Sequence, residues 1–171
     1  MGKVIFMILL IECIAGCLIF GAAVVGSVLI NKTLWLHEYA PAVREEFLRL
    51  HPEYQETKQK TDGVGLVAAK IITCLVFVVI LSYMGYIAGA RDFPSAFCKC
   101  YIIWSAVNWF DVFVLDMGIL AHWKKVRLPG TEHMDKEYRS NNRKSVMEGF
   151  FGAGLGLAVS VIVGGVITLL C

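Results

Sequence analysis

Three carboxylic acids lie inside otherwise apolar stretches of this sequence, and they are the residues with the most informative chemistry. Glu12, Asp111 and Asp116 each fall within a run long enough to cross a lipid bilayer. A charged residue at the centre of a membrane-spanning helix costs roughly 2.5–3.5 kcal/mol on insertion scales, so such residues usually serve a function. Each of the three is therefore a candidate for holding a proton or a cation within the membrane.

Helix counting predicts that two of these acids meet near the middle of the membrane. Counted from the side of the two termini at ~1.5 Å per residue, Glu12 in the first run and Asp111 in the third reach a similar depth. Asn108 shares the helix face of Asp111, and Trp104 continues the same stripe. Two carboxylates at close range do not both ionise readily, so the pair can hold a proton, or a cation with the Asn108 oxygen as a neutral ligand. We predict an ion- or proton-binding site at Glu12, Asn108 and Asp111; the alternative is that the acids stay protonated and serve only helix packing.

A pair of opposite charges is predicted nearer the other side of the membrane. Asp116 lies about seven residues from the end of the third run, and Lys70 stands at the start of the second. Because neighbouring helices carry these charges at matching depth, we predict a structural ion pair between them. Removing one partner of such a buried pair costs about 3–5 kcal/mol, because the other charge is left uncompensated.

Polar residues at and after the end of the third run form the last group of candidates. They are His122, Lys124, Lys125, Arg127, Glu132 and His133. Imidazole and carboxylate groups can ligate a divalent metal, but their spacing matches no metal motif such as His-Glu-x-x-His, so the cofactor is left open. The basic side chains suit the headgroups of anionic lipids at the cytoplasmic face. The alternative is an ordinary basic loop on that side.

The elements that must position these groups are membrane-spanning helices. The chain has 171 residues, of which 57% are hydrophobic and 18% charged, and its mean hydropathy is +0.66. Its apolar residues gather in four runs, at about residues 4–30, 71–90, 101–123 and 149–170. Each run reaches the ~20 residues that cross the hydrocarbon core. We predict an all-α fold in which residues 1–171 form one domain of four transmembrane helices in an antiparallel bundle, without a soluble enzyme domain or a nucleic-acid partner.

Basic residues predict the orientation of these helices. Twelve Lys and Arg residues lie in the first and third connections, residues 31–63 and 124–148, and three lie on the opposite side. Positive charge concentrates in cytoplasmic loops. We therefore predict that both connections are cytoplasmic and that both termini lie outside.

The first connection contains a predicted amphipathic helix that begins at Pro41. Proline is favoured in the first turn of a helix, and Val43, Phe47 and Leu50 then share one face. His51 precedes a proline, which disfavours helical backbone there, so the helix should end near this point. Its apolar face is expected to lie on the membrane surface or against the bundle.

Small residues line one face of the last apolar run. Gly152, Gly156, Ser160 and Gly164 are each four positions apart. Such a ridge lets two helix backbones approach closely in lipid. The partner is predicted to be either another helix of the same bundle or the same helix in a homo-oligomer.

Three functions are compatible with these features. Ion- or proton-linked transport, or binding of an ion or solute through the intramembrane acids, ranks first. A non-catalytic subunit that docks through the helix after Pro41 is one alternative, and a membrane-embedded enzyme acting on a lipid at the cytoplasmic face is another. The sequence contains no nucleophile elbow or phosphate-binding loop, which favours a protein that is not an enzyme.

Overall fold

The computed structural model is helical, and it describes residues 2–36, 38–54, 64–87, 89–140 and 142–170. Those ranges contain no strand. The long helices are α1 (Gly2–Ile30), α4 (Val64–Ile87), α5 (Phe93–Phe110), which continues directly into η3 (Asp111–Leu120), and α7 (Asn142–Leu170). The short helices are η1 (Lys32–Trp35), α2 (Pro41–Leu50), η2 (Pro52–Tyr54), η4 (Lys124–Val126) and α6 (Asp135–Ser140).

Among the residues that the structure describes, three helical stretches are long and apolar enough to cross a membrane, in agreement with the predicted helical membrane protein. They are Val4–Ile30, Phe93–Leu120 and Asp135–Leu170. The described side chains of α4 give a shorter apolar stretch, Leu75–Tyr86. The fourth span, expected at residues 71–90, therefore stays a prediction.

The helix that carries the intramembrane acids begins earlier than the predicted third span. α5 starts at Phe93 and not near residue 101, because Asp92 caps it by accepting the backbone N–H of Ser95 at 3.0 Å. Pro94 stands in the first turn, where its missing N–H costs nothing. The eight extra residues add about 12 Å of helix between the start of α5 and the acids.

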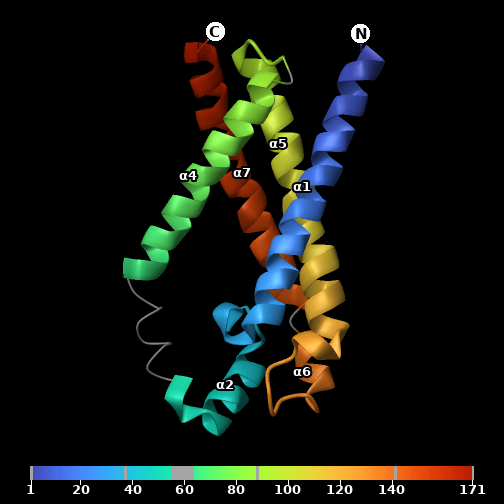
Figure 1. Cartoon of the computed structure of the whole chain (residues 1–171), viewed down its shortest axis with the longest axis vertical. Coiled ribbons are helices and arrows are strands. Elements are labelled where there is room, and N and C mark those ends of the chain that lie inside the picture. The colour runs from blue at the N-terminus through green and yellow to red at the C-terminus, as the bar shows by residue number, and fades with distance from the viewer. Residues whose placement is uncertain (1, 37, 55–63, 88, 141, 171) are drawn as a thin grey trace.

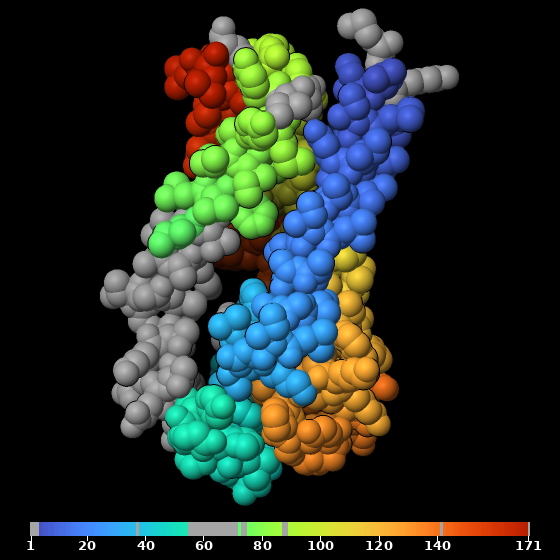
Figure 2. All heavy atoms as spheres, in the orientation of Figure 1, coloured from blue at the N-terminus to red at the C-terminus, as the bar shows by residue number. Residues whose placement is uncertain are grey.

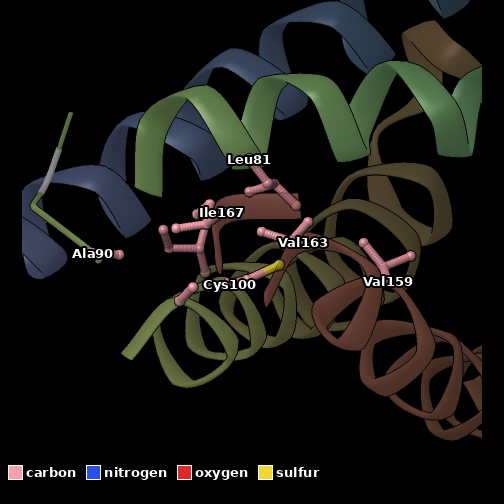
Figure 3. Packing of buried hydrophobic residues seen from close by; sticks show 8 residues of the cluster. Leu81, Ala90, Cys100, Val159, Val163 and Ile167 are labelled. Carbon is pink, nitrogen blue, oxygen red and sulfur yellow. The ribbon is translucent and has the colours of Figure 1, made fainter. Parts of the chain in front are cut away.

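The long helices alternate in direction along the long axis of the molecule (Figure 1). Both termini lie at one end, and α2 and α6 lie at the other. α5 packs most extensively against α7, while α1 and α4 pack against this central pair. A buried apolar cluster joins α4, α5 and α7; Figure 3 shows its side chains converging, among them Leu81, Cys100 and Val163.

Glycines of α7 bring its backbone against the aromatic and polar side chains of α5. A Cβ atom at Gly152 would lie 2.0 Å from Asn108 Oδ1, and one at Gly156 would lie 2.3 Å from Trp104 Cδ1. Nearer the end of α7, a Cβ at Gly164 would lie 2.9 Å from the ring of Phe93. Ser160, on the same face, is buried and donates its hydroxyl to the carbonyl of Gly156. The small-residue face of α7 is thus occupied by α5 of the same chain.

The short helices form a separate small body, which we call the cap (residues 31–36, 38–54 and 124–140). α2 begins at Pro41 and ends at Leu50, as predicted. Its apolar face packs on the third connection, in a buried cluster that consists of Tyr39, Ala40, Val43, Phe47, Leu48, Leu128 and Tyr138. The turn opposite α2 needs Gly130, whose φ is +82° and whose hydrogen faces Leu50. On the face of α2 that the sequence offered for docking, Val43 and Phe47 are therefore covered within the chain, whereas Leu50 is 42% exposed.

Candidate functional site

The third long helix changes its hydrogen-bond pattern at the first of its acids. From Asp111 to Leu120 the backbone is a π-helix, in which bonds join residues five positions apart. Such helices are rare, are mostly single turns and occur often at functional sites, so a ten-residue example is unusual. In an α-helix Asp111 and Asp116 would point ~140° apart, whereas the wider π turn brings them nearer to one side. With the two carboxyl groups nearer to one side of the helix, the negative charge of Asp111 acts on the Asp116 carboxyl.

A cavity of about 190 Å³ reaches Asp111 from between three helices. Its lining is Phe20 of α1, Phe77 and Leu81 of α4, Ile103, Trp104, Val107 and Asn108 of α5, and Asp111 itself. Most of these side chains are apolar, and Phe77 meets Trp104 edge to face, with ring centroids 5.7 Å apart. On the face seen in Figure 2, the surface is hollowed between α4 and α1.

The polar side chains of the cavity wall differ in their hydrogen bonding. Asn108 donates its amide N–H to the carbonyl of Gly149 at 2.9 Å, and Trp104 donates its indole N–H to the carbonyl of Gly152 at 2.9 Å. Both side chains therefore hold α7 against α5, and their orientation is fixed. Within the described part of the chain, no hydrogen-bond donor or basic group contacts the Asp111 carboxyl. Among the described residues, Asp111 is thus the polar group on this wall without a hydrogen-bond partner.

Further acids surround Asp111 on the side of the cap. The charges of Glu38 and Glu148 act on both Asp111 and Asp116, and Glu148 pairs with Lys144 at 3.4 Å. The Asp116 carboxyl is hydrogen-bonded to the side chain of Ser145. A second cavity of about 20 Å³, enough for one water molecule, lies among these groups and is lined by Glu38, Tyr39, Ala40, Asp116, Leu120, Ala121, Tyr138, Asn142 and Ser145.

Glu12 lies away from this group of acids. Residue 16 of α1 faces Val107, and Phe20 reaches the cavity beside Asp111, so Glu12 stands eight residues, about 12 Å, nearer the termini. The charge that acts on Glu12 is that of Lys99 in α5. The structure does not bring Glu12 and Asp111 together, because the earlier start of α5 places Asp111 deeper than the count from residue 101 implied.

Of the predicted ion pair between Lys70 and Asp116, the structure describes the side chain of Asp116. The side chain of Lys70 lies outside the described residues. For Asp116 the structure gives Ser145 as a partner and the neighbouring acids as the charges that act on it. The ion pair stays a prediction.

Arg127 of the third connection is a buried structural residue. It is 1% exposed, donates to the carbonyl of Glu132 at 2.8 Å, pairs with Asp135 at 2.5 Å and lies 4.9 Å from the ring centre of Tyr138. The Arg127 guanidinium holds the pKa of the Asp135 carboxyl below its ordinary value by hydrogen bonding and charge. Tyr39 completes the cap by donating its hydroxyl to the carbonyl of Val126 at 2.7 Å, and burial raises the pKa of that hydroxyl.

The remaining candidates of this connection lie on the surface. His122 is exposed, and with the proton on Nδ1 it donates to the carbonyls of Met117 and Gly118 at the end of η3. Lys124 and Lys125 are exposed, as are Glu132 and His133. Among the described residues, no three His, Cys, Asp or Glu side chains gather closely enough to hold a metal ion.

Sequence reasoning missed the apolar half of the site. Phe20 and Phe77 come from helices whose faces carry no periodic signal, because almost every residue in them is apolar. Trp104 was placed on the stripe of Asn108 and Asp111 without a role. Glu38 lies in a connection, so its approach to Asp116 depends on the fold of the cap.

The sequence matches no protein-family model, no curated protein and no solved structure.

Proposed function

We propose that this chain is a four-span membrane protein that binds a cation or a proton at Asp111 and uses it in ion- or proton-linked transport or solute binding. One observation carries the proposal. Asp111 lies on the wall of a largely apolar cavity, on a π-helical segment, and no basic group contacts it within the described residues. An intramembrane acid in this setting is costly to keep, which favours a functional role.

The proposed spans are α1, α4, α5 with η3, and α7, in an antiparallel bundle. α4 has 24 residues, about 36 Å of helix, which exceeds the ~30 Å of the hydrocarbon core. α1 exposes most of its large apolar side chains, as a lipid-facing helix should. The cap carries the basic first and third connections, so we place it in the cytoplasm and both termini outside.

The neighbouring acids offer a route between the cap and the cavity. Asp116 follows Asp111 along η3, and Glu38 lies beyond it at the small cavity. Carboxyl groups in such a series can pass a proton through a single bridging water molecule. In this proposal Asp111 exchanges its proton for a cation, and Asp116 and Glu38 connect it to the cytoplasm.

The exposed lysines beside the cap are proposed to bind lipid. Lys124 and Lys125 follow the end of η3 next to Trp123, an exposed aromatic residue of the kind that favours the membrane interface. Anionic headgroups attract such a cluster by about 1 kcal/mol per basic residue. A homo-oligomer, if formed through α7, would have to use the face opposite Gly152 and Gly156, since α5 occupies their side.

Asp111→Asn tests the proposed function because it removes the charge and keeps the shape. The midpoint of thermal unfolding of the purified protein in detergent should depend on pH or on sodium chloride in the wild type. Binding to the folded state alone adds about 2.7 kcal/mol at a hundred times Kd, so the effect is measurable. Asp111→Asn should fold and lose this dependence, whereas Glu45→Gln on the exposed face of α2 should retain it. Equal responses of the wild type and Asp111→Asn would contradict the proposal.

A further inference from the structure

We infer that the ligand of the Asp111 cavity is a small lipophilic organic cation, such as a tertiary or quaternary ammonium compound. The inference rests on the proposed function of Asp111 and names the class of ligand that its cavity takes. The volume of the cavity, the chemistry of its walls and the surrounding charge support this class of ligand.

The volume of the cavity favours a small organic molecule. Drug-sized ligands occupy pockets of about 300–1,000 Å³, and a buried apolar cavity of about 150 Å³ is large enough for benzene. The 190 Å³ beside Asp111 lies just above the latter value. This space would leave a bare metal ion largely uncoordinated, because Na⁺ and similar cations need several oxygen ligands. Of the two polar lining residues that carry oxygen, Asn108 places its Oδ1 against Gly152 of α7, where a Cβ atom would lie 2.0 Å from it.

The walls of the cavity present three aromatic rings and one carboxyl group. Phe20, Phe77 and Trp104 come from α1, α4 and α5, so the rings approach the space from three sides. Aromatic faces attract organic cations, and quaternary ammonium groups are the ligands best suited to them. Trp104 is held in place by its bond to Gly152, and Phe77 packs edge to face against it. Asp111 supplies the countercharge.

The charges of the described residues around Asp111 disfavour an anionic ligand. On η3 and α7 the neighbours are Asp116 and Glu148, and Glu38 faces the site from the connection after η1. Among the described residues near this set, the basic Lys144 pairs with Glu148 at 3.4 Å. The described side chains that α1 and α4 contribute to the cavity are uncharged.

Binding of the cation is coupled to release of a proton. At a pH at which the Asp111 carboxyl of the empty cavity holds a proton, entry of the ammonium group breaks the O–H bond, the proton passes to water and the carboxylate pairs with the cation. One positive charge enters the site for each one that leaves. No oxidant, reductant or further reactant is required.

Titration calorimetry of the purified protein with tetraethylammonium tests the inference. The neutral compound of the same shape, 3,3-diethylpentane, separates the role of charge from that of volume. At a pH at which the empty site is protonated, we expect tetraethylammonium to bind and to release about one proton, measured as the dependence of the binding heat on the ionisation enthalpy of the buffer. The neutral compound should bind at least tenfold more weakly. Phe77→Leu should weaken tetraethylammonium roughly three- to thirtyfold, the range for loss of one cation–aromatic contact.

The variants distinguish the inference from the proposed function. Asp111→Asn should abolish proton release and weaken tetraethylammonium at least tenfold, while Glu45→Gln should leave both unchanged. If the wild type responds to pH through Asp111 but does not bind tetraethylammonium, the inference fails and the proposed function stands. If the neutral compound binds as well as the cation, the cavity is an apolar space of the kind that a lipid chain fills, and the inference fails. If Asp111→Asn changes neither the pH response nor the binding, both fail.

Discussion

The cap and the region around Asp111 both hold charged groups, but they satisfy them differently. In the cap, Arg127 is buried and meets a carboxylate, a backbone carbonyl and an aromatic ring. Around Asp111 the neighbouring charges are acidic, and the carboxyl faces an apolar cavity. A buried charge that meets an opposite charge within the protein can be kept by the fold itself, whereas one without such a partner is costly and favours a ligand. The comparison therefore supports a structural role for Arg127 in the cap and the proposed binding role of Asp111 in the cavity.

Removal of the Arg127 side chain should destabilise the cap more than loss of the Tyr39 hydroxyl or of the Asp135 charge. Arg127→Ala deletes a large buried side chain together with its hydrogen bond to Glu132, and we expect a loss of about 2–4 kcal/mol in the free energy of unfolding. The contribution of charge is smaller, because Asp135 is half-exposed and regains water. Denaturant unfolding followed by tryptophan fluorescence measures the loss. A change below 0.5 kcal/mol would remove the structural role from Arg127.

Replacing glycine by alanine in α7 should lower the stability of the protein on the face that packs against α5 and raise it on the opposite face. Gly152→Ala forces a methyl group against Asn108, and we expect a loss of about 1–3 kcal/mol. Gly154→Ala meets nothing within 4 Å and should stabilise the helix by up to about 1 kcal/mol. Thermal unfolding of both variants in the same detergent provides the matched measurement. Equal effects would show that the face of Gly152 is not packed as described.

The hydroxyl of Tyr39 should make a smaller contribution. Tyr39→Phe keeps the ring in the cap core and removes the hydrogen bond to the carbonyl of Val126. We expect a loss of about 1 kcal/mol, mostly from the buried carbonyl that is left without a donor. Tyr83→Phe, whose side chain is exposed, is the control. If both changes have the same effect on chemical unfolding, the bond to Val126 does not stabilise the cap.

The smallest expected effect is a loss of cap stability in acid. Arg127 lowers the pKa of Asp135 in the folded protein, so its ionised form stabilises the fold above the ordinary pKa of about 3.9. That stability is lost as the pH falls through the lowered folded-state pKa. Amide hydrogen exchange of the cap should therefore accelerate below about pH 4 in the wild type and change less in Asp135→Asn. An identical acid profile in Asp135→Asn would assign the loss to other groups.

Local signals in the sequence predicted the helices better than the distances between them. The bounds of α2 follow from Pro41 and from the proline after His51, both of which act on the adjacent backbone. The start of α5 was signalled by Asp92 and Pro94, but the polar residues around Cys98 diluted the apolar run and hid it.

The candidate site was predictable only in its central residues. Asn108 and Asp111 lie on one helix and their shared face follows from spacing, so both were found. The error of two helical turns in the start of α5 carried over to the depth of Asp111 and produced the wrong partner, Glu12. The π-helix and the burial of Arg127 depend on contacts between distant segments, for which spacing within one helix gives no signal.

The most direct test of a ligand-binding carboxyl at Asp111 is infrared difference spectroscopy of the protein between acidic and alkaline pH. Wild-type protein and Asp135→Asn should share a carboxylic acid C=O band that is lost on raising the pH, and Asp111→Asn should lack that band. If Asp111→Asn gives the same difference spectrum as the wild type, Asp111 does not exchange a proton and the assignment of the cavity as a binding site is contradicted.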